Sequence, residues 1–140
     1  MLVRQILEET EAFPTVVTDV TVRDAAEVMR SNDVRAVPVV EGEKLVGIVT
    51  DWDIVDAFAA EGNVLADRPV SAIMTSERLH TIDLDATVAY ATAKLQEKRV
   101  HHLPVLEDGR YVGMICLGLE WSDGNMLVPP MRPALTARRP

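Results

Sequence analysis

The sequence contains very little cysteine and few basic residues. Cys116 is the single cysteine among 140 residues, so the chain cannot form an intramolecular disulfide. Lys and Arg total 14 against 22 Asp and Glu, which leaves a formal net charge of −8. Nucleic acids and anionic membrane surfaces are bound through basic patches, so this balance disfavours both as partners.

Long apolar runs are missing as well. The chain begins MLVRQILEETEAF, in which no basic stretch is followed by a long apolar one, and this disfavours a secretory leader. The apolar runs elsewhere are too short to span a bilayer. We therefore expect a cytoplasmic protein that does not associate with membranes.

Signatures of catalysis are also absent. The sequence has no glycine-rich phosphate loop and no recognisable set of nucleophile, base and orienting residue. Cys116 with His101 or His102 as its base is one alternative, but a cysteine within a strand is more typical of a small buried thiol. The two histidines have no further ligand nearby to complete a metal shell. We predict that the chain is not an enzyme and holds neither a metal nor a catalytic cofactor.

The feature that is present is an internal repeat. Residues 15–53 (copy one) and 81–119 (copy two) align without a gap at an offset of 66 residues. Each copy is too small to bury a convincing core alone, so we expect the two to pack about a pseudo-two-fold axis. The positions that are identical in both copies are, in copy one, Thr15, Asp19, Thr21, Val22, Ala25, Val34, Pro38, Val39, Glu41, Val46 and Gly47.

Each copy predicts the element order β-α-β-β-α, an α+β fold. A β-favouring stretch precedes a capping-box pattern at Thr21, after which apolar residues recur at helical spacing. Two apolar runs joined by a short polar turn then predict a β-hairpin in each copy. Residues 54–59 predict a second helix that ends at Gly62, whereas the matching segment after copy two, LGLEWSDGNML, is a weaker helix because glycines interrupt it. Residues 2–9 predict a short helix before Pro14.

The motifs of both copies resemble those of the cystathionine-β-synthase (CBS) domain over about residues 8–124. Copy one reads VRAVPVV (34–40) and then VGIVTDWD (46–53). Copy two reads VHHLPVL (100–106) and then VGMIC (112–116), and PVSAIMT (69–75) precedes it. CBS domains occur in such pairs, called Bateman modules. The resemblance implies a first repeat at 8–65, a second at 70–124 and a tail at 125–140.

The resemblance also implies a ligand. In that family the pair forms two clefts, and AMP, ADP, ATP or S-adenosylmethionine binds in one or both. By resemblance, Asp53 would accept hydrogen bonds from ribose hydroxyls, and Thr50 would reach ribose or phosphate. The same Thr-x-x-Asp spacing is also typical of a capping box at a helix start. Copy two has Cys116 and Leu119 at these positions, so we predict one nucleotide-competent cleft and one altered or silent cleft.

Other candidate ligand contacts follow from the same resemblance. Basic residues before the apolar-Pro step often face ligand phosphates, although they are equally typical of exposed residues before a strand. Apolar residues of the first strand and of the apolar-Pro step line the adenine slot, although the simpler interpretation is core packing. Trp52 is more readily interpreted as covering its own core than as stacking on a base. The phosphate candidates are Arg35, His101 and His102, and the adenine candidates are Val16, Val37, Pro38, Ile82 and Pro104.

The leading hypothesis is a stand-alone regulatory CBS pair that binds an adenosine-containing ligand and signals to a partner or through its own dimer interface. The alternative is a scaffold or dimerisation module whose clefts have decayed. Bateman modules commonly form homodimers through their helices, which directs attention to Val55, Phe58 and Ala59 after copy one and to Leu119 and Trp121 after copy two.

Overall fold

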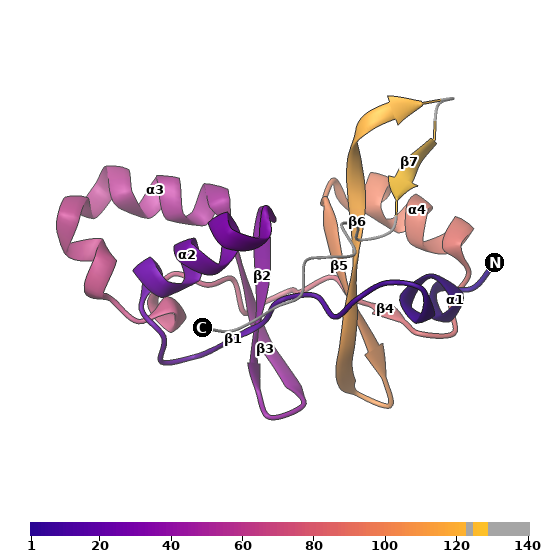
Figure 1. Ribbon diagram of the computed structural model, residues 1–140, viewed down its shortest axis with the longest axis horizontal. Coiled ribbons are helices and arrows are strands. Elements are labelled where there is room, and N and C mark those ends of the chain that lie inside the picture. The colour runs from indigo at the N-terminus through magenta and orange to yellow at the C-terminus, as the bar shows by residue number, and fades with distance from the viewer. Residues whose placement is uncertain (123–124, 129–140) are drawn as a thin grey trace. The chain divides into compact units, whose positions relative to one another are not determined.

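The computed structural model describes residues 1–122 and 125–128, which form two compact units (Figure 1). One unit contains Pro14–Leu79 and holds copy one. The other joins Met1–Phe13 to the chain from His80 onward and holds copy two. The predicted tail lies mostly outside the described residues.

The unit of copy one has a three-stranded sheet in the order β1-β2-β3. β1 and β2 are parallel and α2 connects them, while β2 and β3 form the predicted antiparallel hairpin. The elements are β1 (Val16–Val17), α2 (Val22–Asn32), β2 (Ala36–Glu41), β3 (Lys44–Thr50), α3 (Asp51–Glu61) and the 3₁₀ turns η1 (Gly62–Asp67) and η2 (Val70–Ala72).

The unit of copy two repeats this order as far as its hairpin. Its sheet has the order β4-β5-β6-β7, with β4 parallel to β5 and the other pairs antiparallel. The elements are α1 (Val3–Glu8), β4 (Ile82–Asp83), α4 (Val88–Lys98), β5 (His102–Glu107), β6 (Arg110–Ser122) and β7 (Asn125–Val128).

The weak helix predicted after copy two is wrong, because β6 continues through that segment. Cys116 and Leu117 of β6 pair with β7. In copy one the chain turns into α3 at Thr50, where a capping box satisfies the first free N–H groups. Cys116 and Leu119 stand at the matching positions and cannot build that box, so the extended backbone continues.

The repeat is visible in the backbone at helix ends and in the strand register. α2 and α4 each begin at a threonine whose side chain accepts the N–H three residues on, and each ends at a residue with φ near +57°. The registers of the two hairpins shift at matching places, between Val39 and Val40 and between Val105 and Leu106. The two copies therefore share their irregularities as well as their element order.

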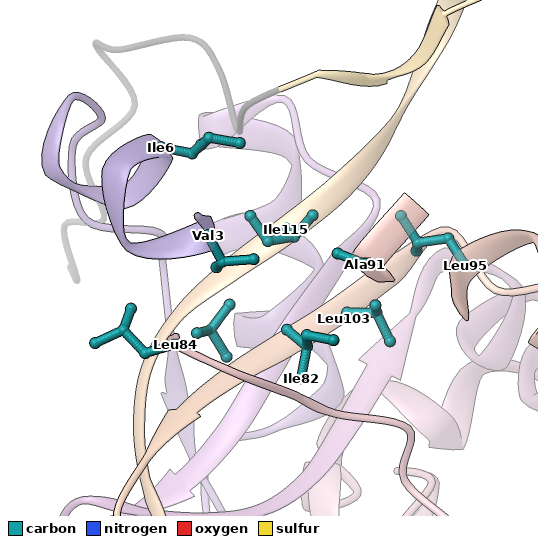
Figure 2. Close-up of a cluster of buried hydrophobic side chains, with 9 residues drawn as sticks. Val3, Ile6, Ile82, Leu84, Ala91, Leu95, Leu103 and Ile115 are labelled. Carbon is teal, nitrogen blue, oxygen red and sulfur yellow. The ribbon is translucent and has the colours of Figure 1, made fainter. Parts of the chain in front are cut away.

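Each unit has its own apolar core. The core of the copy-two unit gathers side chains from α1, β4, α4, β5 and β6 around the fully buried Leu103 and Ile115 (Figure 2). The core of the copy-one unit packs α2 against the sheet around the fully buried Val37, Val39 and Val49.

The segment that precedes copy one folds with copy two. Val3 is fully buried in the copy-two core, and its N–H donates to the carbonyl of Ala86 at 2.9 Å. The segment after copy one makes the matching contact in its own unit, where Val70 is fully buried and its N–H donates to Val20 at 2.8 Å. Residues 1–8 and 68–75 are thus structural equivalents, and each completes the core of one unit.

Candidate functional site

The candidate site lies where β3 ends and α3 begins. Thr50 is the N-cap of α3, and its hydroxyl oxygen accepts the N–H of Asp53 at 3.2 Å. The Asp53 carboxylate reciprocates, because its Oδ2 accepts the N–H of Thr50 at 2.9 Å. The capping-box interpretation of this pair is therefore confirmed.

The capping box leaves hydrogen-bonding capacity on both side chains. The Thr50 hydroxyl accepts in the box, so its own hydrogen can still be donated. Within residues 1–122 and 125–128, Oδ1 of Asp53 accepts no hydrogen bond. A half-buried carboxylate with one oxygen held and the other open can accept from a ligand hydroxyl, so capping and ligand contact are compatible.

Arg35 lies beside this junction. Its carbonyl accepts the N–H of Asp51 at 2.9 Å, and its Nε lies 4.0 Å from Oδ2 of Asp51. Both side chains are more than half exposed, so this ion pair is weak and the guanidinium can turn toward an anion. The structure thus brings Arg35, Thr50 and Asp53 to one end of the copy-one sheet.

The adenine candidates are core residues in this structure. Val16, Val37 and Ile82 belong to the apolar clusters of their units and are exposed by 5% or less. Pro38 and Pro104 are buried at matching hairpin positions, opposite Ile48 and Met114. The core-packing interpretation is confirmed for the three cluster members, and adenine contact stays a prediction for all five.

Copy two presents different chemistry at the matching junction. Burial raises the pKa of the Cys116 thiol to about 12, so the thiol is protonated near neutral pH and is a poor nucleophile. Cys116 as a whole is half-buried, so the expected small thiol lies within the strand without being fully buried. His101 is exposed, and His102 opens β5 opposite Cys116. Phosphate contact by either histidine stays a prediction.

Trp52 does not cover a core, contrary to the sequence interpretation. Its side chain is 66% exposed at the first turn of α3. The inner side of this helix is instead taken by Ile54, which packs against the copy-one cluster. The reason is angular, because residues two apart on a helix point in widely different directions.

Sequence reasoning missed Tyr111. Its hydroxyl is buried and has no hydrogen-bond partner among the described residues. Burial raises the pKa of Tyr111, and the nearby Cys116 adds to this shift. The repeat could have drawn attention to Tyr111, because the equivalent residue in copy one is the apolar Leu45.

Other features do not join the candidate site. A small hollow in the copy-two unit is lined by Leu7, by Thr10–Phe13 and by Val112–Met114, which include none of the predicted ligand contacts. In the described part of the chain, no group of three His, Cys, Asp or Glu side chains could hold a metal ion. No helix there is long and apolar enough to cross a membrane.

A family model describes the two segments that carry these motifs. The model of the CBS domain matches residues 3–60 and 70–118. The chain belongs to the CBS-domain family. The two matches make it a CBS pair, as the repeat predicts.

Curated relatives agree with this assignment. The chain is 31% identical over 109 residues to the CBS domain-containing protein YhcV of Bacillus subtilis, covering 78% of this chain and 76% of YhcV. It is 33% identical to the mitochondrial CBS domain-containing protein CBSX3 of Arabidopsis thaliana, covering 72% and 51%. It is 34% identical to a homoserine O-acetyltransferase of Methanococcus vannielii, covering 76% and 22%. The chain thus spans about half of CBSX3 and about a fifth of the acetyltransferase.

Solved structures show the same fold. A CBS-domain containing protein from Agrobacterium tumefaciens superposes with a TM-score of 0.74 at 28% identity, covering 83% of this chain and 93% of that one. The CBS domain pair of protein MJ0100, in complex with 5′-methylthioadenosine and S-adenosyl-L-methionine, gives 0.69 at 27% identity, covering 83% and 89%.

Proposed function

We propose that this CBS pair is a regulatory module that binds an adenosine-containing ligand through copy one. The observation that carries the proposal is the Thr50–Asp53 capping box, which holds the Asp53 carboxylate in place and leaves Oδ1 open. A carboxylate with an open oxygen suits the vicinal hydroxyls of a ribose, and Arg35 lies beside it to meet a phosphate or a carboxylate. The CBS pair of MJ0100, a structural neighbour, holds two adenosine derivatives.

The bound state would be transmitted by unequal affinity. A ligand shifts a conformational equilibrium only when it binds the two states with different affinities. The conformational shift would act on a regulated partner protein or on the module's own homodimer. The exposed residues of α3 would take part in the homodimer. Val55 and Phe58 support this, because they are 53% and 54% exposed.

A second candidate function is a ligand-free scaffold. Copy two favours it, because it has the half-buried, protonated thiol of Cys116 where copy one has the Thr50 hydroxyl. If copy one does not bind a ligand either, Asp53 serves only as a helix cap.

Calorimetric titration with AMP, ADP, ATP and S-adenosylmethionine separates the two functions. We expect one of the four to bind, and we expect Asp53→Ala and Asp53→Glu each to weaken it at least tenfold. Glu is the usual third residue of a capping box, so Asp53→Glu should keep the melting temperature while moving the carboxylate. Asp24→Ala is the matched control at the same position of α2 and should bind normally. Absence of binding by all four ligands, or full affinity in Asp53→Glu, would contradict the proposed site.

A further inference from the structure

Of the eleven positions that are identical in both copies, two are charged, namely Asp19 with its equivalent Asp85 and Glu41 with its equivalent Glu107. In copy two these carboxylates hold an arginine. Nε and Nη2 of Arg4 donate to Oδ1 of Asp85 at 3.0 and 2.9 Å, and Nη2 lies 3.3 Å from Oε2 of Glu107. The guanidinium of α1 thus bridges both carboxylates, for which its planar fork of donors is well suited.

The backbone of copy one places Asp19 and Glu41 as copy two places their equivalents. β1 pairs with β2 at Val17 and Val40, and the pairing of β4 with β5 is the same after the offset of 66 residues. In both units the chain then turns, with one backbone hydrogen bond across the turn of 3.3 Å in copy one and 3.0 Å in copy two. Asp19 lies at this turn and Glu41 directly follows Val40, and we call these two residues the acidic pair.

Copy one lacks the arginine. Val3 and Val70 are equivalent, because their N–H groups donate to carbonyls at matching positions of the repeat. The residue after Val3 is Arg4, whereas the residue after Val70 is Ser71, which is exposed and carries no charge. In the part of the chain that the structure describes, the acidic pair forms neither an ion pair nor a side-chain hydrogen bond.

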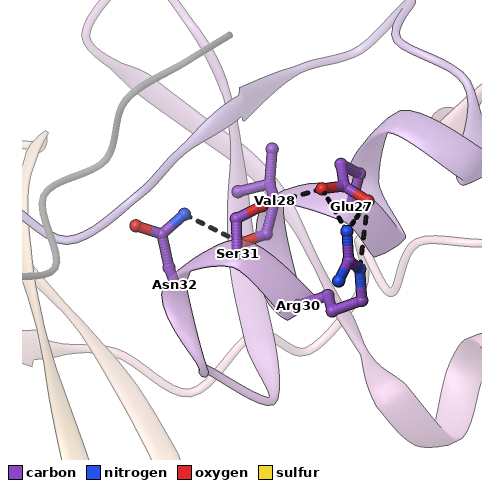
Figure 3. A network of polar contacts seen from close by, with 5 residues as sticks. All are labelled: Glu27, Val28, Arg30, Ser31 and Asn32. Carbon is purple, nitrogen blue, oxygen red and sulfur yellow. Dashed lines mark hydrogen bonds and ion pairs between the residues drawn. The ribbon is translucent and has the colours of Figure 1, made fainter.

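Cations of the copy-one unit do not take the place of Arg4. Arg30 donates to both carboxylate oxygens of Glu27 at 2.9 to 3.2 Å, so its guanidinium is held within α2 (Figure 3). Lys44 lies opposite Glu41 in the hairpin register, but no ion pair joins them among the described residues. The acidic pair therefore keeps two charges without a cation, in a chain whose net charge is already −8.

We propose that the acidic pair of copy one is a binding site for the guanidinium of an arginine side chain supplied from outside the copy-one unit. The equivalent carboxylates bind this same group in copy two. A guanidinium donates to two carboxylates at once, whereas a lysine ammonium is a compact point charge. A metal ion suits the site less, because no group of three His, Cys, Asp or Glu side chains in the described residues could hold one. The site uses neither Thr50 nor Asp53, so it is independent of the proposed adenosine ligand.

Two sources can supply the arginine, and their chemistry is the same. One is a basic segment of a partner protein, which the acidic chain would attract. The other is the end of the chain itself, because residues 129–140 contain Arg132, Arg138 and Arg139 and no Asp or Glu.

Titration of the full chain with N-acetyl-L-argininamide tests the site, with the backbone amide NMR signals of Asp19 and Glu41 as the readout. We expect both signals to shift saturably. N-acetyl-L-lysinamide should bind about fivefold more weakly, and Asp19→Asn should weaken binding of the arginine probe about fivefold. Asp56→Asn removes an exposed carboxylate of α3 and is the matched control, which should bind the arginine probe normally.

Exchanging the residue that distinguishes the copies tests the site from both sides. Ser71→Arg should fill the acidic pair from within the chain and abolish the shifts caused by the probe. Ser71 is exposed, so the longer side chain needs no buried space. Arg4→Ser should open the equivalent site, so that the probe also shifts the amide signals of the equivalent carboxylates in copy two.

The triple variant Arg132→Gln/Arg138→Gln/Arg139→Gln separates the two sources. Tighter binding of the probe than in the wild-type chain would assign the site to the end of the chain, and unchanged binding would assign it to a partner protein. The proposal would be overturned by equal affinity for the arginine and lysine probes, by undiminished binding in Ser71→Arg, or by absence of shifts at the acidic pair in both the wild-type chain and the triple variant. In each case the calorimetric titration would still decide adenosine binding.

Discussion

At the scale of single residues, two substitutions between the copies have both a structural and a chemical effect. Thr50 and Asp53 build a capping box, and the same two side chains, through the open Oδ1 of Asp53 and the hydroxyl hydrogen of Thr50, are the best candidates for a ribose contact. Cys116 and Leu119 can do neither, since a thiol is a weak acceptor and leucine has no acceptor at all. One pair of changes therefore removes the helix start and the polar end of the candidate site together.

Tyr111 gives a prediction at this scale. Its hydroxyl is buried without a partner, so Tyr111→Phe removes a polar group that folding has taken out of water. We expect the free energy of unfolding to rise by about 1 kcal/mol in urea denaturation. Tyr90→Phe is the matched control on an exposed ring and should be neutral. A loss of stability in Tyr111→Phe would show that the hydroxyl has a partner, such as a bound water.

At the scale of elements, two segments outside the repeat complete the cores. α1 joins the core of copy two, and the segment containing η2 joins the core of copy one. Each of these segments also packs a side chain against a glycine of the second hairpin strand. Leu7 lies where a Cβ on Gly113 would be, and Met74 lies where a Cβ on Gly47 would be. A side chain at Gly113 would displace the end of Leu7, and one at Gly47 would displace Met74 and press on the backbone carbonyl of Thr75, so the constraint is the stricter at Gly47.

Paired substitutions test this exchange of segments. Val3→Ala and Val70→Ala each remove two methyl groups from a fully buried site, so each should destabilise the protein by about 2 kcal/mol. Hydrogen exchange should show that the two variants lose stability in different units. Val3→Ala should accelerate exchange in α4, β5 and β6, and Val70→Ala in α2, β2 and β3. Equal acceleration of both units in either variant would mean that the two cores unfold as one.

At the scale of the whole molecule, the asymmetry of the copies predicts a stoichiometry. If the candidate site binds as proposed, calorimetry at saturating ligand should give one molecule per chain. The reason is that copy two presents a half-buried neutral thiol at the place of the Thr50 hydroxyl. Two equivalent sites per chain would show that the ligand does not depend on the Thr-x-x-Asp pair.

The pattern of the sequence was sufficient for the repeat, the α+β class and the element order of copy one. The signals for these are local: threonine caps at Thr21, Thr50 and Thr87, apolar residues at helical spacing, and polar turns between apolar runs. Each signal acts through hydrogen bonds or turns within a few residues, so it can be read without knowing the rest of the fold.

Tertiary structure decided the features that depend on distant parts of the chain. Nothing local in residues 1–8 shows that Val3 joins the core that contains Leu103, because the rest of that core lies about 80 to 110 residues further along the chain. The exposure of Trp52 and the burial of the Tyr111 hydroxyl are likewise set by what lies around them. Caps and turns are determined by neighbours along the chain, whereas burial is determined by neighbours in space, and only folding brings the latter together.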